Sequence, residues 1–153
     1  MVSASSANNP KADPPPGQAV ELRIPSHPAH TRSVQEQIER QLKAHHYTEH
    51  EIFSIKLAVE EALVNAIKHG NQMDQGRTVH VSYRILPDRF DIHITDEGSG
   101  FDPCGVPDPT TPENLERPCG RGLMLMRYYM TEVAYNERGN CVRMSKQRRN
   151  GAM

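Results

Sequence analysis

Residues 49–70 constrain the fold more than any other stretch, because they have the period of one long amphipathic helix. Apolar residues recur there every three or four positions, which is the spacing of a single helix face (Ile52, Ile55, Val59, Ala62, Leu63, Ala66 and Ile67). Thr48 and Glu51 form a capping-box pattern at the start, and Gly70 is a typical C-cap. The sequence therefore predicts a helix from Glu49 to about His69 that packs on a core.

Two polar side chains near the end of this helix are candidate site residues. Glu61 and Asn65 are four positions apart, so they are neighbours on the same side of the helix. A carboxylate beside a carboxamide suits a site that needs a proton acceptor next to an oxygen ligand for a hard cation. Such a pair is more often a solvated helix edge, and two later stretches favour the functional interpretation.

Size, charge and cysteine usage limit the class of protein. The 153 residues suffice for one domain with a substantial core, and the net charge of −1 gives no basic field that would indicate a nucleic-acid partner. The three cysteines have no C-x-x-C spacing, which favours a reducing compartment. Because no segment is typical of a leader peptide or a membrane span, we expect a cytoplasmic protein.

The remaining pattern predicts an α+β fold. Residues 1–17 are rich in Pro, Ser and Asn and predict a disordered tail, and residues 148–153 predict a second, solvated tail. Between them the periodicities predict a strand ended by Pro25, a helix over 28–45, the long helix, a hairpin of strands over 79–85 and 90–94, a helix over 122–129, and strands over 131–135 and 141–146. We expect one domain over 18–147, a two-layer α/β sandwich with helices on one face of a mixed, mainly antiparallel sheet.

Asp96 is the second candidate site residue. It continues the alternation of Phe90, Ile92 and Ile94, so it is predicted to point toward the core at the end of its strand. A core-facing carboxylate is costly unless a partner satisfies it. Gly98 and Gly100 follow, and glycines there permit positive φ and close approach of a ligand to the backbone.

A long loop and a glycine pair form the third candidate region. Residues 103–119 contain five prolines and predict a loop of the kind that covers a site. Gly120, Arg121 and Gly122 then lead into the helix that contains Leu123. Backbone N–H groups at such a helix start favour phosphate. A base-binding acceptor, a metal ligand and phosphate donors are the parts of a site for a metal nucleotide.

These three stretches resemble the motifs of the GHKL ATPase superfamily. Glu61-x-x-x-Asn65-Ala66-x-x-His69-Gly70 is similar to its N box, and Asp96-x-Gly98-x-Gly100 and Gly120-Arg121-Gly122-Leu123 are similar to its two glycine boxes. The nearest likeness is to the anti-sigma-factor serine/threonine kinases of the RsbW and SpoIIAB type. The likeness extends over about residues 18–147.

The resemblance implies a Bergerat fold that binds ATP and Mg²⁺. It implies that Asn65 coordinates Mg²⁺, that Glu61 is the general base, and that Asp96 accepts from the adenine amino group. Gly98 and Gly100 would shape the adenine pocket, residues 103–119 would form the ATP lid, and Gly120, Arg121, Gly122 and Leu123 would hold the phosphates. The implied partners are a STAS-domain anti-anti-sigma factor, a sigma factor and a second copy of the chain.

Other functions are compatible with the same motifs. A regulatory module could bind ATP and a partner without phosphoryl transfer, although such a module would need no base at Glu61. The catalytic half of a histidine kinase should follow a helical hairpin with a phosphoacceptor histidine, and gyrase-like or chaperone ATPases should carry transducer domains. The sequence therefore favours the protein kinase over these alternatives.

Overall fold

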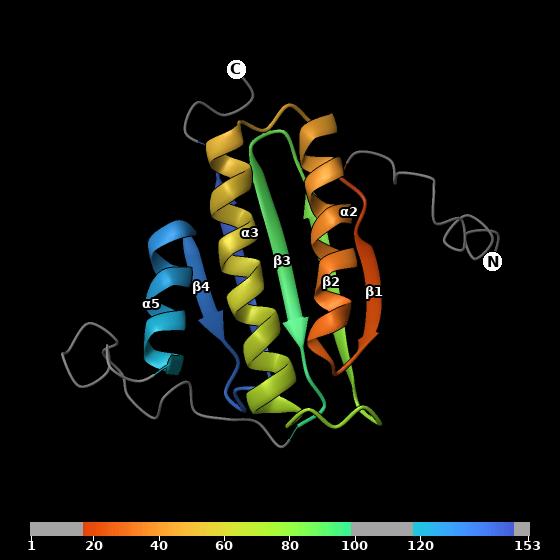
Figure 1. Cartoon of the computed structure of the whole chain (residues 1–153). Coiled ribbons are helices and arrows are strands. Elements are labelled where there is room, and N and C mark those ends of the chain that lie inside the picture. Colours follow the sequence, from red (N-terminus) through yellow and green to blue (C-terminus); the bar gives the residue numbers. More distant parts are fainter. Residues whose placement is uncertain (1–16, 99–117, 149–153) are drawn as a thin grey trace, which may run out of the picture.

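A computed structural model describes residues 17–98 and 118–148, with side chains for all of these except residues 118–122. Helices cover one face of a five-stranded sheet (Figure 1), which confirms the predicted α+β sandwich. The predicted tail over residues 1–16 and the loop over residues 103–117 lie outside the described residues. In chain order the elements are β1 (Val20–Pro25), the 3₁₀ turn η1 (Pro28–His30), α2 (Thr31–Ala44), α3 (Glu49–Val64), the π-helical turn η2 (Asn65–Gly70), β2 (Thr78–Ile85), β3 (Arg89–Thr95), α5 (Pro118–Tyr129), β4 (Glu132–Tyr135) and β5 (Cys141–Gln147).

The sheet has the strand order β1-β2-β3-β5-β4, and every pairing between the described strands is antiparallel. The expectation of a mixed sheet was therefore wrong for this part of the chain. Two antiparallel helices, α2 and α3, return the chain between β1 and β2, which makes those neighbours antiparallel (Figure 1). The crossover through α5 makes β3 and β4 run in the same direction, but β5 lies between them, so no parallel pair forms.

The core lies between the helical layer and the inner face of the sheet. Inward-facing residues alternate along β2 and β3, as the sequence predicted, and the helices supply their apolar faces. The largest of the almost completely buried side chains are aliphatic, methionine or aromatic (among them Tyr83, Phe90, Ile38, Leu42, Ile55, Leu63, Ile67, Met126 and Met144). Burial of each such side chain contributes roughly 1.5–3 kcal/mol, so these residues dominate the stability of the domain.

Helix starts are set by side chains that the sequence pattern identified only in part. The Thr48 and Glu51 capping box is confirmed, because each side chain accepts from the other residue's backbone N–H. The preceding helix differs from the prediction, since Pro28 opens a 3₁₀ turn and α2 begins at Thr31. The Thr31 hydroxyl donates to the Pro28 carbonyl at 2.9 Å, which joins the turn to the helix.

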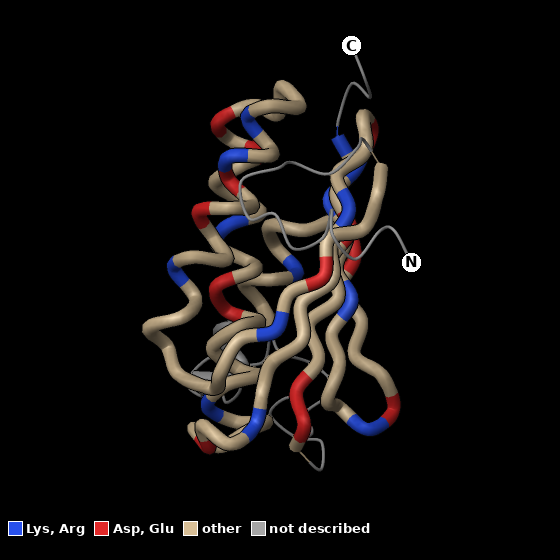
Figure 2. The backbone as a smooth tube through the Cα atoms, turned by 90° about the vertical axis from the view of Figure 1, so that its right-hand side faces the viewer, with Lys and Arg blue, Asp and Glu red and all other residues tan. Residues whose placement is uncertain are grey.

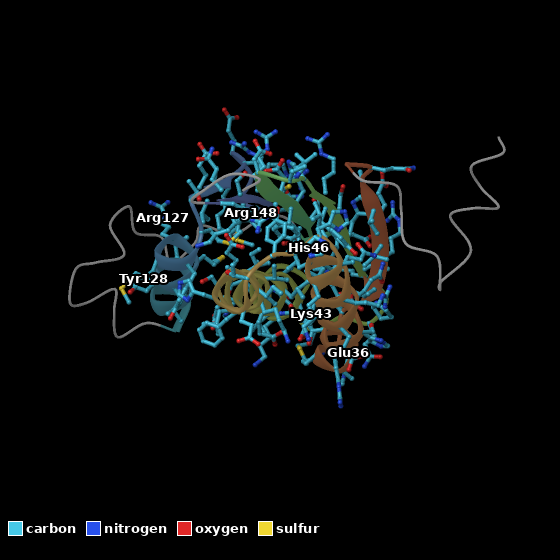
Figure 3. The ribbon with its side chains drawn as sticks, turned by 90° about the horizontal axis from the view of Figure 1, so that it is seen from above. Glu36, Lys43, His46, Arg127, Tyr128 and Arg148 are labelled. Atoms are coloured by element: carbon cyan, nitrogen blue, oxygen red, sulfur yellow. The ribbon has the colours of Figure 1, made fainter. Side chains whose placement is uncertain are left out.

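Arg148 closes the end of the sandwich where α3 begins, although it was expected in a solvated tail. Its side chain is only 10% exposed and pairs with Glu51 at 3.2 Å. It also donates to the carbonyl of His46 at 2.8 Å (Figure 3). Its guanidinium lies over the Tyr47 ring. The long reach and several donors of arginine make these tertiary contacts possible, and no local pattern reveals them.

Charged residues occur along both layers of the described part (Figure 2). Several form salt bridges with oppositely charged residues that lie close in space, such as Lys56 with Glu39 at 2.5 Å and Arg89 with Asp91 at 3.0 Å. Among the described residues, no helix is both long and apolar enough to cross a lipid bilayer.

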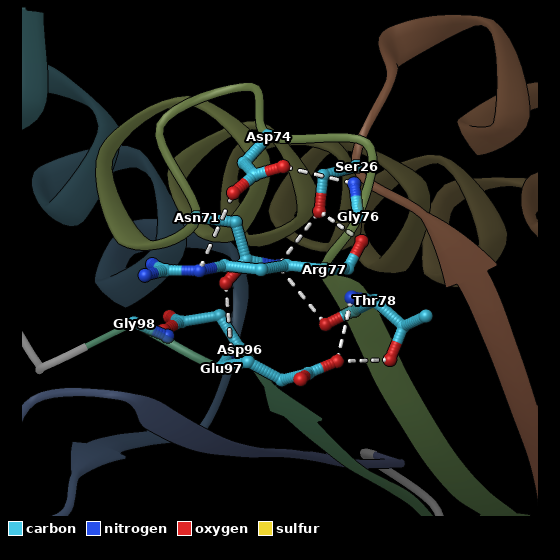
Figure 4. Close-up of polar contacts among 9 residues, drawn as sticks. All are labelled: Ser26, Asn71, Asp74, Gly76, Arg77, Thr78, Asp96, Glu97 and Gly98. Atoms are coloured by element: carbon cyan, nitrogen blue, oxygen red, sulfur yellow. Dashed lines mark hydrogen bonds and ion pairs between the residues drawn. The ribbon is translucent and has the colours of Figure 1, made fainter.

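Asn71 joins the end of the helical layer to three strands (Figure 4). Its side chain is fully buried. Its amide donates to the Ser26 hydroxyl at 2.7 Å and to the Thr78 carbonyl at 2.9 Å. Its carbonyl oxygen accepts from the Glu97 N–H at 2.7 Å. One carboxamide therefore fixes the segments that follow β1 and β3 and the start of β2 relative to η2.

We expect Asn71→Ala to lower the free energy of unfolding by about 3 kcal/mol, because it leaves several buried donors and acceptors without partners. Urea denaturation followed by circular dichroism measures the change. Gln75→Ala, at an exposed position in the adjoining turn, is the matched control and should change stability by less than about 0.5 kcal/mol. Equal stabilities of the two variants would contradict this role of Asn71.

Candidate nucleotide site

The end of the long helix differs from the predicted regular helix. The α-helix ends at Val64, and residues Asn65–Gly70 form a π-helical turn. The N–H of Asn71 bonds to the carbonyl of Ala66, five residues earlier, at 2.8 Å. The widened turn accompanies the hydrogen bonds from the Asn71 side chain to segments at the ends of the strands. These are tertiary contacts, which the helical period cannot predict. Single π-turns inserted in helices are frequent at functional sites.

Asn65 and Glu61 both lie at this end of the helix, as predicted. Asn65 is the first residue of η2, and its side chain is 6% exposed. Glu61 lies one turn earlier and is half-buried. Its neighbour Glu60 instead faces α2, where it accepts from the Gln35 amide at 3.3 Å. A carboxylate and a buried carboxamide are thus placed together, and both offer oxygens to a hard cation.

Asp96 is buried at the end of β3, as the strand alternation predicted. It is 4% exposed, and its carboxylate accepts from the N–H of Gly98 at 2.8 Å. Burial raises the pKa of Asp96, while the Gly98 N–H and then the positive charges of Arg138 and Arg77 act in the opposite direction. A buried acceptor with few internal donors is suited to a ligand that brings its own N–H.

Gly70 and Gly98 are also required for packing, which the sequence did not predict. A Cβ atom at Gly70 would lie 2.2 Å from an Asp96 carboxylate oxygen. A Cβ atom at Gly98, where close approach of a ligand was expected, would lie 2.0 Å from the carbonyl oxygen of Gly70. Neither is among the described glycines with positive φ. The two glycines therefore let the end of the helix contact the end of β3 directly.

The glycine pair after the loop lies inside a helix. The helix α5 begins at Pro118, so the predicted start at Gly122 was four residues late. Proline fits the first helical position because its missing N–H has no partner there and its φ is already helical. The backbone of Gly120, Arg121 and Gly122 therefore belongs to the first turns of α5. Leu123 is buried in the core, and Gly100 lies outside the described residues.

The three candidate regions meet at one end of the molecule. Figure 1 shows the last turn of α3, the end of β3 and the first turn of α5 at the same end of the sandwich. This end is opposite to the one that Arg148 closes. The topology explains the meeting, because α3 and β3 run toward this end and α5 starts from it.

The sequence patterns missed two residues of this region. Asn71 follows the helix directly, and only its position next to Gly70 could have drawn attention to it. Tyr135 was predicted only as a residue of the strand over 131–135. Burial raises its pKa to about 12, and a hydrogen bond from the side chain of Asn65 acts in the opposite direction. No local pattern links positions 65 and 135, so only the fold reveals this contact.

Comparison with known proteins identifies the family of this domain. Residues 24–146 match the histidine kinase-like ATPase domain. The chain belongs to this family. The ATPase domain is 29% identical to the serine-protein kinase RsbW of Bacillus subtilis over 134 residues, which cover 83% of this chain and 84% of the relative. It is 31% identical over 88 residues to the serine/threonine-protein kinase BtrW of Bordetella bronchiseptica, covering 56% of this chain and 62% of BtrW. The predicted likeness to kinases of the RsbW type is confirmed.

The contact between Gly70 and Asp96 predicts a non-additive pair of substitutions in this ATPase domain. We expect Gly70→Ala to lower the free energy of unfolding by about 2 kcal/mol or more, because the new methyl group overlaps the carboxylate. In an Asp96→Ala background the overlap is removed. The loss of free energy of unfolding caused by Gly70→Ala should therefore be at least about 1 kcal/mol smaller there than in the wild type. Urea denaturation of the four proteins measures this coupling.

Gly76→Ala is the control for the Gly70 cycle, because a Cβ there meets only the Asp74 side chain at 3.2 Å in an exposed turn. Gly76→Ala should lower the free energy of unfolding only slightly, and its effect should be additive with that of Asp96→Ala. Additivity of Gly70→Ala with Asp96→Ala would show that the two residues do not contact each other.

The buried Asp96 predicts a pH-dependent difference between the wild type and Asp96→Asn. Because burial raises the pKa of Asp96, the folded state binds its proton more tightly than the unfolded chain does. The wild type therefore loses this part of its stability as the pH rises through the folded-state pKa. We expect the stability of Asp96→Asn relative to the wild type to increase as the pH rises above about 4 and through the folded-state pKa of Asp96. Urea denaturation of the ligand-free proteins measures it, and a constant difference would contradict the prediction.

Proposed function

We propose that this histidine kinase-like ATPase domain is a serine/threonine protein kinase of the anti-sigma-factor type that uses ATP and Mg²⁺. The observation that carries the proposal is the meeting of the end of α3, the end of β3 and the start of α5 at one end of the sandwich (Figure 1). Each of these segments contains one of the three motifs. The likeness to the kinases RsbW and BtrW supports the same activity.

In this proposal Asp96 binds the adenine base. Among the described residues its carboxylate accepts from the Gly98 N–H, and it can accept a further hydrogen bond from the adenine amino group. The buried environment that raises its pKa also excludes water, which strengthens a hydrogen bond to the base. Gly98, together with Gly100, would complete the wall of this adenine pocket.

The phosphates are assigned to the segments on either side of the adenine pocket. The buried carboxamide of Asn65 would coordinate Mg²⁺, which neutralises phosphate charge when bound. Gly120, Arg121, Gly122 and Leu123 would lie against the phosphate oxygens near the positive end of the α5 helix dipole. Residues 103–119 remain the proposed ATP lid, although α5 includes the last two of them.

Glu61 is the proposed general base. It lies one helical turn from Asn65, so its carboxylate can take the proton of a serine or threonine hydroxyl as that oxygen attacks the γ-phosphorus. The bond from phosphorus to the bridging oxygen breaks, and ADP leaves. A module that only bound ATP would not need this carboxylate.

The partners follow from the family likeness. We propose that the phosphorylated protein is a STAS-domain anti-anti-sigma factor, that the domain sequesters a sigma factor, and that it acts as a homodimer in the cytoplasm. The domain boundaries over residues 18–147 remain part of this proposal, with Arg148 added because its side chain packs against the domain.

The experiment combines ATP binding with phosphoryl transfer. We expect Glu61→Ala to bind ATP and Mg²⁺ as the wild type does in calorimetry, but to transfer γ-phosphate to a cognate STAS-domain protein at least about 100-fold more slowly. Asn65→Ala should instead lose about 1–3 kcal/mol of binding free energy, because it removes a metal ligand. Transfer is followed with radiolabelled ATP.

Glu60→Ala is the matched control, because this neighbouring carboxylate faces α2 and should be dispensable for both steps. Tight ATP binding without transfer by the wild type would indicate a regulatory binding module. Absence of ATP binding by the wild type would overturn the proposed function altogether.

A further inference from the structure

The peptide group that joins Asp96 to Glu97 is held by asparagines from two other parts of the chain. Its N–H donates to the side-chain oxygen of Asn71 at 2.7 Å (Figure 4). Its carbonyl oxygen accepts from the side-chain amide of Asn140 at 3.4 Å, and the N–H of Asp96 donates to the Asn140 carbonyl at 2.9 Å. The backbone on both sides of the Asp96 side chain therefore has fixed partners.

The partners of Asn71 allow its carboxamide only one orientation. The Thr78 carbonyl can only accept, so it needs the amide nitrogen, which it meets at 2.9 Å. The Glu97 N–H can only donate, so it needs the carboxamide oxygen. Rotation of the carboxamide by half a turn would break both hydrogen bonds, and Asn71 is fully buried, so bulk water could not replace them. The Asn71 oxygen is therefore a fixed acceptor for the Glu97 N–H.

The residue before Asn71 lies against the Asp96 carboxylate itself. A Cβ atom on Gly70 would lie 2.2 Å from Oδ2 of Asp96, so this oxygen packs directly on the Gly70 backbone. The other oxygen, Oδ1, accepts from the Gly98 N–H at 2.8 Å. Gly70 and Asn71 thus contact Asp96 and Glu97 as two consecutive pairs, one at the carboxylate and one at the peptide group that follows it.

This arrangement matters because a hydrogen bond to a nucleobase depends on the direction of the acceptor. Hydrogen bonds prefer an angle at the hydrogen above about 150° and weaken steeply as the angle falls. A rotation of the peptide group after Asp96 would move the Cα–Cβ bond and the carboxylate with it. Residues that bind a ligand are kept in their productive geometry by the contacts of neighbouring residues.

We propose that Asn71 is a positioning residue, whose side-chain oxygen holds the Glu97 N–H and so directs the Asp96 carboxylate toward the 6-amino group of a bound adenine nucleotide. This inference rests on the proposed function, because it assumes that Asp96 binds adenine. It goes beyond the contribution of Asn71 to stability, since the same oxygen also sets the preference for adenine. Asn71 acts through Asp96 and needs no contact with the nucleotide.

The test compares ATP with purine riboside triphosphate, which lacks only the 6-amino group. Calorimetry in the presence of Mg²⁺ measures the affinity of each nucleotide. We expect the wild type to bind ATP at least about 10-fold more tightly, because the amino group donates to a buried carboxylate. In Asn71→Ala this ratio should fall to about three-fold or less, while the affinity for purine riboside triphosphate stays within about three-fold of the wild type.

Ser26→Ala is the matched control, because it removes a different hydrogen bond of the same carboxamide. The buried Ser26 hydroxyl accepts from the Asn71 amide at 2.7 Å. The substitution leaves the Asn71 oxygen on the Glu97 N–H, so the preference for ATP should stay within about two-fold of the wild type. An equal loss of preference in Ser26→Ala and Asn71→Ala would overturn the inference, because general damage to the junction would then explain both.

Hydrogen exchange on the ligand-free wild type tests the same bond without any substitution. We expect the Glu97 N–H to exchange at least about 100-fold more slowly than an amide in an unstructured peptide, because its acceptor is buried. Rapid exchange of this N–H would overturn the inference, whether or not Asn71→Ala folds.

The outcomes separate the inference from the proposed function. If the wild type prefers ATP and Asn71→Ala keeps that preference, Asn71 does not position Asp96. If Asn71→Ala binds both nucleotides more weakly by the same factor, its role is structural and the inference fails as well. If the wild type binds no ATP, or binds both nucleotides equally, the proposed adenine contact of Asp96 itself fails.

Discussion

The direct contact between the end of the helical layer and the end of β3 is the constraint on which the rest of this domain depends. It exists because two glycines remove the side chains that would separate the two backbones, Gly70 on the helix side and Gly98 after the strand. Asn71 then fixes the same junction with three hydrogen bonds to other segments. The ends of a helix and a strand are thereby buried together, and Asn71 supplies hydrogen-bond partners to the Thr78 carbonyl and the Glu97 N–H.

This junction also explains why a carboxylate can be buried in an aliphatic core. Asp96 lies in the space that the absent side chain of Gly70 leaves open, and within the described part of the chain it accepts from the Gly98 N–H. The raised pKa of Asp96 shows that this environment is unfavourable for its charge in the ligand-free protein. A fold optimised only for stability would place an apolar residue here, so the carboxylate is best explained by a ligand that donates to it.

The two ends of the sandwich have different physical characters. At one end Arg148 holds Glu51, the carbonyl of His46 and the ring of Tyr47 together, which closes the sandwich with charge and cation–π contacts. At the other end the helix and strand termini meet with buried polar groups that belong to the proposed site. The apolar core separates the end that Arg148 closes from the end with the proposed site.

Local sequence determined most of the elements and the candidate site residues. The period of residues 49–70, the alternation along β2 and β3 and the capping box at Thr48 depend on neighbours in the chain, so they predicted the long helix, the hairpin and the inward direction of Asp96. Only the tertiary structure decided the π-helical turn, the start of α5 at Pro118, the roles of Gly70 and Gly98, and the contacts of Asn71, Tyr135 and Arg148. These features depend on residues distant in sequence that the fold brings together, and a periodic pattern carries no information about such partners.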